Sequence, residues 1–267
     1  MPNYQPITQT HYAHKRWLRT SSYAFAMKDA ILPLSLTELS RAMMTLPIAL
    51  IQQNDSYLPA AVTSLQPNRN FCVTADGRWI HGYVPAACRS HPFRFLKTPE
   101  GQQVLCIDED SGLVQEGAEG EAFFDEEGKA TPAVQEILSF LQQAEHGKLA
   151  STAACAVLAQ HHLIVPWPIT LKTETGEKQI SGLYRIDEPA LNQLSAEALL
   201  EVRNAGGLLI AYCQLLSMQH LPILGQLADA HAKAEQAAAE ASKLIAQNGE
   251  LNIDFLNKND TLSFGGF

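Results

Sequence analysis

The chain has 267 residues, of which 46% are hydrophobic, and a formal net charge of −9 at pH 7. This length and composition allow one large domain, or two closely packed ones, with a core that needs no disulfide or metal to stabilise it. The negative charge argues against general nucleic-acid binding. The five cysteines are odd in number and form no C-x-x-C pair, which indicates reduced thiols in a cytoplasmic protein rather than a disulfide framework.

The sequence contains no pattern typical of a secretory leader. Near the N-terminus, no apolar run of about seven to fifteen residues ends in a small-residue cleavage site. The longest apolar run, residues 206–218, is too short and too interrupted to cross a bilayer. We therefore expect a soluble, cytoplasmic protein with no membrane span.

Charged residues are distributed unevenly along the chain. Residues 98–128 contain ten acids and no Lys or Arg, whereas residues 1–28 contain no acid and carry Lys15, Arg16, Arg19 and Lys28. One interpretation is a solvated basic arm and a separate solvated acidic region. The alternative is that the basic arm docks on the acidic segment, either within the chain or on a partner.

The first clear element is a helix in residues 34–47. Ser35 is the predicted N-cap, and Glu38 three residues later completes a capping box. Pro47 ends the helix, because the residue before a proline is disfavoured in helical conformation.

From Pro47 to about Phe124 the pattern changes to short strands separated by turn signals such as Asn-Asp, Asp-Gly and Ser-Gly. The connections are mostly too short for helical crossovers, so we expect antiparallel pairing. The predicted strands are residues 47–52, 58–65, 70–75, 79–85, 103–109 and 120–125.

A second clear helix begins after Thr131, its predicted N-cap, and has Pro132 in the first helical position. Gly147 fits a C-terminal cap, and residues 150–162 continue as a helix. The next segment, residues 165–187, is typical of a hairpin that turns near Thr175-Gly176.

The C-terminal third is predicted to be mostly helical, with short helices in residues 187–194 and 195–207. Residues 208–217 fit either a buried strand or a helix. We favour a strand, because Gly207 restarts the chain and Ser217 can cap the following helix. That last helix runs from about Gln219 to Gln247 and is rich in Ala, Lys and Glu.

These elements predict an α+β fold: an antiparallel sheet built from short strands and hairpins, flanked by helices, with a long C-terminal helix. We expect two parts, an α+β domain in residues 1–229 and an Ala-rich helix with a polar tail in residues 230–267. Spaced apolar residues let the tail dock in a groove of its own domain or of a second copy, which suggests homo-oligomerisation through this helix and tail.

The stretch GRWIHGYVPAACRSHPFRFL, residues 77–96, is the densest group of functional side-chain types. It fits a ligand pocket or a rigid structural corner. In the second interpretation Arg89 tethers a carboxylate, Asp108 or Asp125, at the edge of the core. Cys88 fits a small buried residue better than a thiol with a depressed pKa.

The candidate ligand- or partner-binding residues come from this stretch, the basic arm and the acidic region. They are His14, Arg16, Trp79, Tyr83, Arg89, His91, Asp108 and Asp125.

Neither a metal site nor a cofactor is expected. No H-E-x-x-H, H-x-D or H-x-E…C-x-x-C motif occurs around the nine histidines. Asp108, Asp110 and Glu119 match three positions of a calcium loop, but Leu113 stands where that loop needs glycine, so we interpret the segment as a strand end and a turn. Nucleophile elbows, P-loops and dinucleotide fingerprints are also absent.

Several sequence blocks, taken in order, resemble the SapC family, named for a surface-layer-associated protein of bacteria. They are NYQPITQTHYAHKRW, YAFAMKDAILPLSLTELSRAMMTLPIAL, GRWIHGYVPAACRSHPF, LCIDEDSGLV, GEAFFDEEGKATPAVQEILSFL, GLYRIDEPALNQLS and GGLLIAYCQLLSM. The resemblance covers roughly Asn3 to Leu227. It implies a link to surface-layer proteins or their export, and the frequent location of family members near outer-membrane receptors and halogenase-like proteins implies an accessory or peptide-related role. It carries over no catalytic residues.

The first hypothesis is a cytoplasmic accessory protein that recognises a polypeptide partner. The lack of a catalytic motif and the expected sheet edges, which can accept an added strand, favour it over an enzyme. The alternative is an enzyme that modifies a peptide or small molecule without a familiar motif, which a deep pocket lined by Arg89, His91 and an acid would favour. A structural component of the surface layer is the least favoured hypothesis, because no signal peptide is evident.

Overall fold

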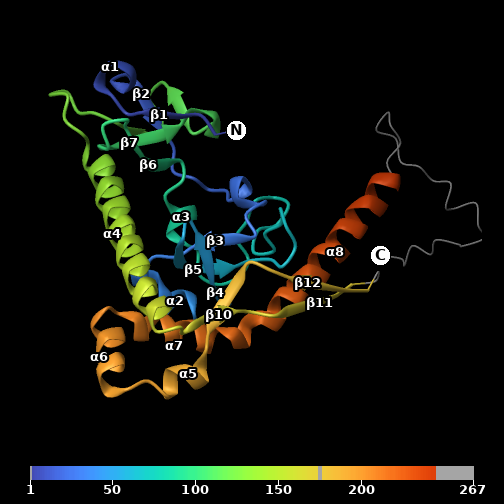
Figure 1. Ribbon diagram of the computed structural model, residues 1–267. Coiled ribbons are helices and arrows are strands. Elements are labelled where there is room, and N and C mark those ends of the chain that lie inside the picture. Colours follow the sequence, from blue (N-terminus) through green and yellow to red (C-terminus); the bar gives the residue numbers. More distant parts are fainter. Residues whose placement is uncertain (1, 174–175, 245–267) are drawn as a thin grey trace, which may run out of the picture. The chain divides into compact units, whose positions relative to one another are not determined.

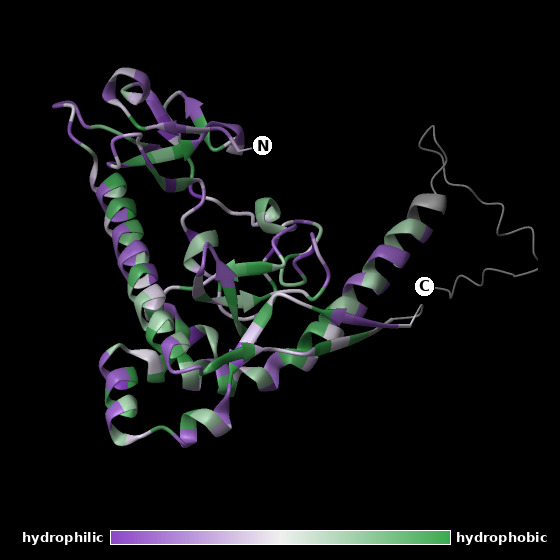
Figure 2. Ribbon diagram, in the orientation of Figure 1, coloured by the Kyte–Doolittle hydropathy of each residue, from purple (hydrophilic) through white to green (hydrophobic). Residues whose placement is uncertain are grey.

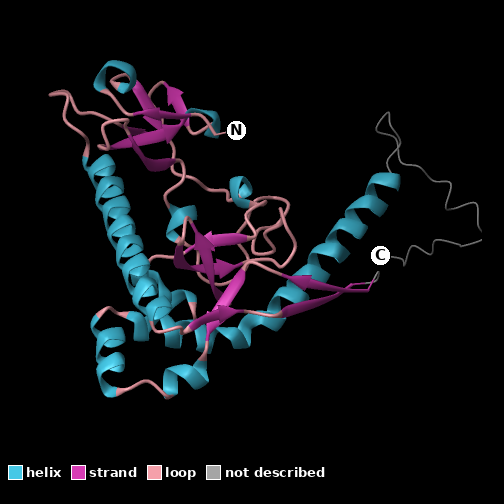
Figure 3. Cartoon of the chain, viewed as in Figure 1, coloured by secondary structure: helices cyan, strands magenta, loops and turns pink. Residues whose placement is uncertain are grey.

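The computed structural model describes residues 2–173 and 176–244, and the chain divides into two compact units, Met1–Leu224 and Gly225–Phe267 (Figure 1). The predicted α+β class is confirmed: short antiparallel strands and several helices mix within unit 1, and a long helix follows at the C-terminal end (Figure 3). The predicted domain boundary at residues 229–230 stays a prediction.

Among the described residues, every strand pair is antiparallel, as the short connections predicted. The sheets have the strand orders β1-β7-β6, β8-β2-β9, β10-β13-β4-β5-β3 and β11-β12. The strands are β1 (Tyr4–Pro6), β2 (Lys15–Trp17), β3 (Ile31–Pro33), β4 (Ile48–Gln53), β5 (Ser56–Val62), β6 (Phe93–Lys97), β7 (Gln103–Asp108), β8 (Val114–Glu116), β9 (Glu121–Ala122), β10 (Ile164–Pro166), β11 (Ile169–Thr173), β12 (Gly176–Ile180) and β13 (Leu183–Ile186).

The helices lie mainly in the second half of the chain. The α-helices are α1 (Gln9–Tyr12), α2 (Leu39–Ala42), α3 (Ala86–Arg89), α4 (Pro132–Gln160), α5 (Glu188–Asn192), α6 (Ala196–Asn204), α7 (Gly207–Ser217) and α8 (Leu221–Leu244). The 3₁₀ turns are η1 (Ala24–Ala26), η2 (Leu36–Glu38), η3 (Glu109–Ser111) and η4 (Met218–His220).

The five-stranded sheet is centred on the hairpin of β4 and β5, whose inner residues are hydrophobic and buried (Figure 2). Gln53 pairs with Ser56 across a two-residue turn in which Asn54 and Asp55 both have positive φ, 47° and 60°. Asn and Asp adopt this conformation at lower cost than most residues, which is why the Asn-Asp pair marks the hairpin.

The strands predicted at residues 70–75 and 79–85 were wrong. Only an isolated bridge joins Val73 to Trp79. The buried side chain of Asn70 accepts a hydrogen bond from the Cys72 amide (2.9 Å) and donates one to the Ala26 carbonyl (3.0 Å), so it satisfies backbone groups that a ladder would otherwise pair. Conversely, the short strands β1, β2, β3, β6 and β8 were not predicted from the sequence.

The basic arm docks on the acidic segment within the chain, which is the second of the two interpretations of the charge asymmetry. β1 pairs with β7, and β2 lies between β8 and β9. An aromatic core backs these ladders: Tyr12 contacts Phe123, and Trp17 meets Phe93 edge to face, with ring centroids 4.9 and 4.7 Å apart.

Helix α4 is one continuous helix, not a helix that ends near Gly147. Thr131 caps it as predicted, accepting from the Val134 amide. Gly147 is buried inside the helix, where a Cβ atom would lie 2.9 Å from the Cβ of Ser35. The glycine therefore permits α4 to approach the η2 turn closely, which is a packing role rather than a capping role.

Residues 208–217 form helix α7, so the predicted strand was wrong. Gly206 has a φ of 80° and ends α6, and α7 starts at once. The buried side chains of α7 bind backbone groups of the central sheet: Ser217 Oγ accepts from the Ile48 amide (2.9 Å), and Gln214 Oε1 accepts from the Ile186 amide (2.9 Å). Ser217 therefore does not cap the next helix.

One helical stretch of the described chain, Gly207–Glu240, is long and apolar enough to cross a membrane by length and composition. A buried core helix meets the same criterion, and α7 packs against α4. The hairpin of β11 and β12 is confirmed, with Thr173 paired to Gly176. The end of the last predicted helix, residues 245–247, and the tail, residues 248–267, lie outside the described residues.

Replacing Gly147 tests the contact between α4 and η2. We expect Gly147→Ala to lower the free energy of unfolding by about 1–3 kcal/mol, because the new methyl group overlaps Ser35 in a well-packed interior. Gly225→Ala is the matched control: it lies in α8 with no atom within 4 Å of the added Cβ, so helix propensity should stabilise it by up to about 1 kcal/mol. Urea unfolding measures both, and equal effects would contradict the packing role.

Candidate functional site

The predicted capping box at Ser35 and Glu38 is present, but Glu38 does more than cap. The residue is only 5% exposed. One carboxylate oxygen accepts from the Ser35 amide (2.9 Å) and hydroxyl (2.7 Å). The other accepts from the Ala86 amide (2.6 Å) and the Tyr83 hydroxyl (3.1 Å). Glu38 thereby joins η2 to the start of α3, a contact between segments about fifty residues apart.

Arg89 pairs with this cluster rather than with the acidic region, so the predicted partners Asp108 and Asp125 were wrong. Its guanidinium donates to the Tyr83 hydroxyl (2.7 Å) and the Val84 carbonyl (3.0 Å) and lies 3.8 Å from Glu38. The same group stacks over Phe140 of α4, 4.9 Å from the ring centre. Burial raises the pKa of Tyr83, as does the Glu38 carboxylate, against the opposing effect of Arg89. This arrangement is the rigid corner of the structural interpretation.

Trp79 and His91 belong to a chain of four contacting rings. His91 stacks on Phe25 with centroids 3.7 Å apart, Phe25 lies 6.2 Å from Tyr23, and Tyr23 lies 5.7 Å from Trp79. The indole of Trp79 donates to the His81 carbonyl (2.7 Å). Burial lowers the pKa of His91, which the Asp108 carboxylate partly offsets.

The other predicted residues are spread over the N-terminal sheets. His14 is exposed in a turn, and Arg16 donates to the Gly120 carbonyl (2.9 Å). Asp108 is buried, ends β7 and accepts from the Asn3 and Asp110 amides, as the strand-end interpretation expected. Asp125 is exposed and closes a turn by accepting from the Lys129 amide. The eight predicted residues therefore do not line one pocket.

The residues that the structure describes form neither a metal-binding cluster nor a reactive thiol site. No cluster of three or more His, Cys, Asp or Glu side chains with metal-binding geometry occurs there. All five cysteines are buried and free. Burial raises the pKa of Cys88 to about 12, so this thiol is a small core residue rather than a nucleophile.

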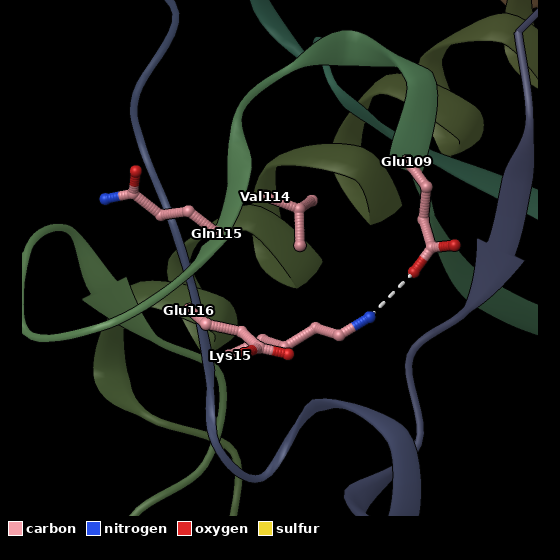
Figure 4. Close-up of a pocket in the computed structure, with 5 residues that line it drawn as sticks. All are labelled: Lys15, Glu109, Val114, Gln115 and Glu116. Atoms are coloured by element: carbon pink, nitrogen blue, oxygen red, sulfur yellow. Dashed lines mark hydrogen bonds and ion pairs between the residues drawn. The ribbon is translucent and has the colours of Figure 1, made fainter.

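Two hollows lined in part by charged side chains adjoin Glu109, a residue that was not among the candidates from the sequence. One hollow of about 290 Å³ is lined by Lys15, Glu109 and all three residues of β8 (Figure 4). A second of about 270 Å³ shares Glu109 and is lined also by Gln5, Pro6, Thr8 and His11. The only sequence signal for this site was the basic arm opposite an acidic segment.

Glu109 is contacted by three side chains of the N-terminal arm. One carboxylate oxygen lies 3.0 Å from the Tyr12 hydroxyl, 3.1 Å from His11 Nε2 and 3.2 Å from Lys15 Nζ. Burial alone would raise the pKa of Glu109, but these hydrogen bonds outweigh burial and keep the pKa below its ordinary value. Burial and the Glu109 carboxylate raise the pKa of Tyr12. The site is therefore a fixed ion pair at the mouth of a hollow.

The edge strand β8 presents unpaired backbone groups beside this ion pair. The Leu18 amide donates to the Leu113 carbonyl (2.9 Å), one step beyond the pair of Trp17 with Val114. Because hydrogen-bonded and non-hydrogen-bonded pairs alternate in an antiparallel ladder, Val114 and Glu116 direct their N–H and C=O groups away from β2. Within the described chain, no strand pairs with this outer edge of β8.

The Glu38 cluster can be tested by removing each partner. We expect Glu38→Ala to lower the free energy of unfolding by about 3 kcal/mol, because buried amide donors lose their acceptor. Arg89→Ala should cost about 1 kcal/mol or less, since Glu38 keeps its four shorter hydrogen bonds and Arg89 is partly exposed. Arg78→Ala, which breaks the exposed pair with Asp76, is the control with almost no expected effect. Denaturant unfolding would contradict the assignment if Arg89→Ala were the more damaging change.

The lowered pKa of His91 predicts how stability depends on pH. The folded protein favours neutral His91, so its contribution is complete above the ordinary pKa of 6.5 and is lost as the pH falls from there toward the lower folded pKa. We expect the wild-type chain to lose more unfolding free energy between pH 7.5 and 5 than the His91→Gln variant. Parallel loss in both proteins would mean that His91 titrates normally.

One protein family matches most of this chain. The model of the SapC family matches residues 7–224, close to the limits of unit 1. Neither the curated proteins nor the solved structures gave a match to the chain. The family match covers most of the sequence and the same region as the ordered sequence blocks described above. The chain belongs to the SapC family.

Proposed function

We propose that this SapC-family chain is an accessory protein that binds an extended segment of a polypeptide partner along the open edge of β8. The observation that carries the proposal is the outward direction of the N–H and C=O groups of Val114 and Glu116 beside the hollow at Lys15 and Glu109. An added strand satisfies such groups, and side-chain pockets along the edge supply specificity.

The geometry suits a short strand. The outward groups of Val114 and Glu116 are about 7 Å apart, so a peptide of a few residues can form hydrogen bonds with both. β2, held on its other side by β9, fixes the position of β8. The partner therefore meets a rigid edge and not a loop that has to be ordered, which lowers the entropic cost of binding.

The peptide-modifying enzyme is the weaker alternative, because the candidate groups do not converge. Arg89 is engaged with Tyr83 and the Val84 carbonyl, and the hollows around Glu109 are lined by neither Arg89 nor His91. Membership of the SapC family suggests that the partner is linked to surface-layer or outer-membrane proteins. The same proposal places the protein in the cytoplasm, without a membrane span and without nucleic-acid binding.

The experiment compares two substitutions at Glu116. Random heptapeptides displayed on phage are selected on the full-length chain, and a selected peptide is titrated into Glu116→Pro and Glu116→Ala. Both variants lose the carboxylate, but only proline removes the outward N–H. We expect the proline variant to bind about tenfold more weakly than the alanine variant, the effect of one lost hydrogen bond.

Hydrogen exchange supplies the second measurement. Peptide binding should slow exchange of the Val114 and Glu116 amides and leave the Gln115 amide, which points toward β2, unchanged. Melting curves establish that both Glu116 variants remain folded. Equal affinity of the proline and alanine variants, or protection confined to other strands, would contradict binding along β8.

A further inference from the structure

We infer that the segment bound along β8 carries a lysine or arginine opposite Glu116. The inference rests on the proposed strand addition and names the class of partner: a basic extended peptide. It follows from how the charges around β8 are paired within the chain.

Glu116 lacks the cation that its position in the ladder would provide. Lys15 stands directly opposite Glu116 in the pairing of β2 with β8. Yet the ammonium of Lys15 lies 3.2 Å from Glu109 and 3.0 Å from His11, so it is directed to the far side of the hollow. No hydrogen bond or ion pair joins the Glu116 carboxylate to any other described residue, and the residue is exposed. Among the five residues drawn in Figure 4, only Lys15 and Glu109 are joined by such an interaction.

Two further cations of the arm, Arg16 and Arg19, are also engaged elsewhere. Arg16 donates to the Gly120 carbonyl, and Arg19 pairs with Glu121 and Glu136. Near β8 this leaves the exposed acids Asp110, Glu116 and Glu119. The local charge at the open edge is therefore negative, and it complements a basic partner.

The register of an added strand places the partner's cation correctly. A residue paired with Glu116 across the open edge projects its side chain to the same face of the sheet as Glu116. Lys15 projects to that face from the opposite side of β8. A lysine or arginine of the partner would thus meet Glu116 at the mouth of the hollow, while Lys15 stays bound to Glu109.

The test uses three synthetic heptapeptides of alternating Thr and a variable residue, which is Lys, Gln or Glu, with blocked ends. Each is titrated into the full-length chain and followed by NMR. We expect the Lys peptide to bind about fivefold more tightly than the Gln peptide, the size of one partly exposed charge pair, and the Glu peptide to bind most weakly. Glu116→Gln should remove the preference, and Glu116→Lys should reverse it.

Glu188→Gln is the matched control, because it removes one exposed acid on α5. It should leave the preference for Lys intact. A loss equal to that of Glu116→Gln would mean general attraction to an acidic chain and would overturn the inference. If all three peptides bind equally and Glu116→Pro weakens each, the charge inference fails and the strand-addition proposal stands. If Glu116→Pro has no effect on any peptide, both fail.

Discussion

The fold of unit 1 depends on one buried carboxylate. A capping-box glutamate usually acts within its own turn, but Glu38 uses one oxygen for Ser35 and the other for Ala86 and Tyr83. The close approach of Gly147 to Ser35 then sets α4 against the same turn, and Arg89 lies between Tyr83 and Phe140. A buried carboxylate is tolerated only when its oxygens are hydrogen-bonded, so these segments must assemble together.

Local signals predicted the features whose cause is local. The capping box at Ser35, the N-cap at Thr131 and the hairpin expected to turn near Thr175-Gly176 each follow from neighbouring residues; both caps are present, and β11 pairs with β12. Features set by distant contacts were missed. Nothing near residues 208–217 indicates that Gln214 will bind a strand amide, and nothing near Arg89 indicates that its anionic neighbour is Glu38, fifty-one positions earlier.

The candidate site shows the same limit. The uneven charge of the sequence indicated that the basic arm and the acidic segment belong together, and the ladders of β1 and β2 confirm the docking within one chain. Which acids pair with a cation depends, however, on the register in which β8 pairs with β2. A shift of one residue would turn Val114 and Glu116 toward β2 and direct Gln115 outward. The open edge and its unpaired acid are therefore properties of the three-dimensional pairing, not of the residue pattern.

An open edge strand is also a hazard, because two copies of a chain can pair along it. Here the hazard is limited by charge: Glu116 in β8 and Glu119 just after it are exposed acids, so two copies pairing along β8 would place like charges near one another. The acids that favour a basic partner thus also disfavour self-association along β8.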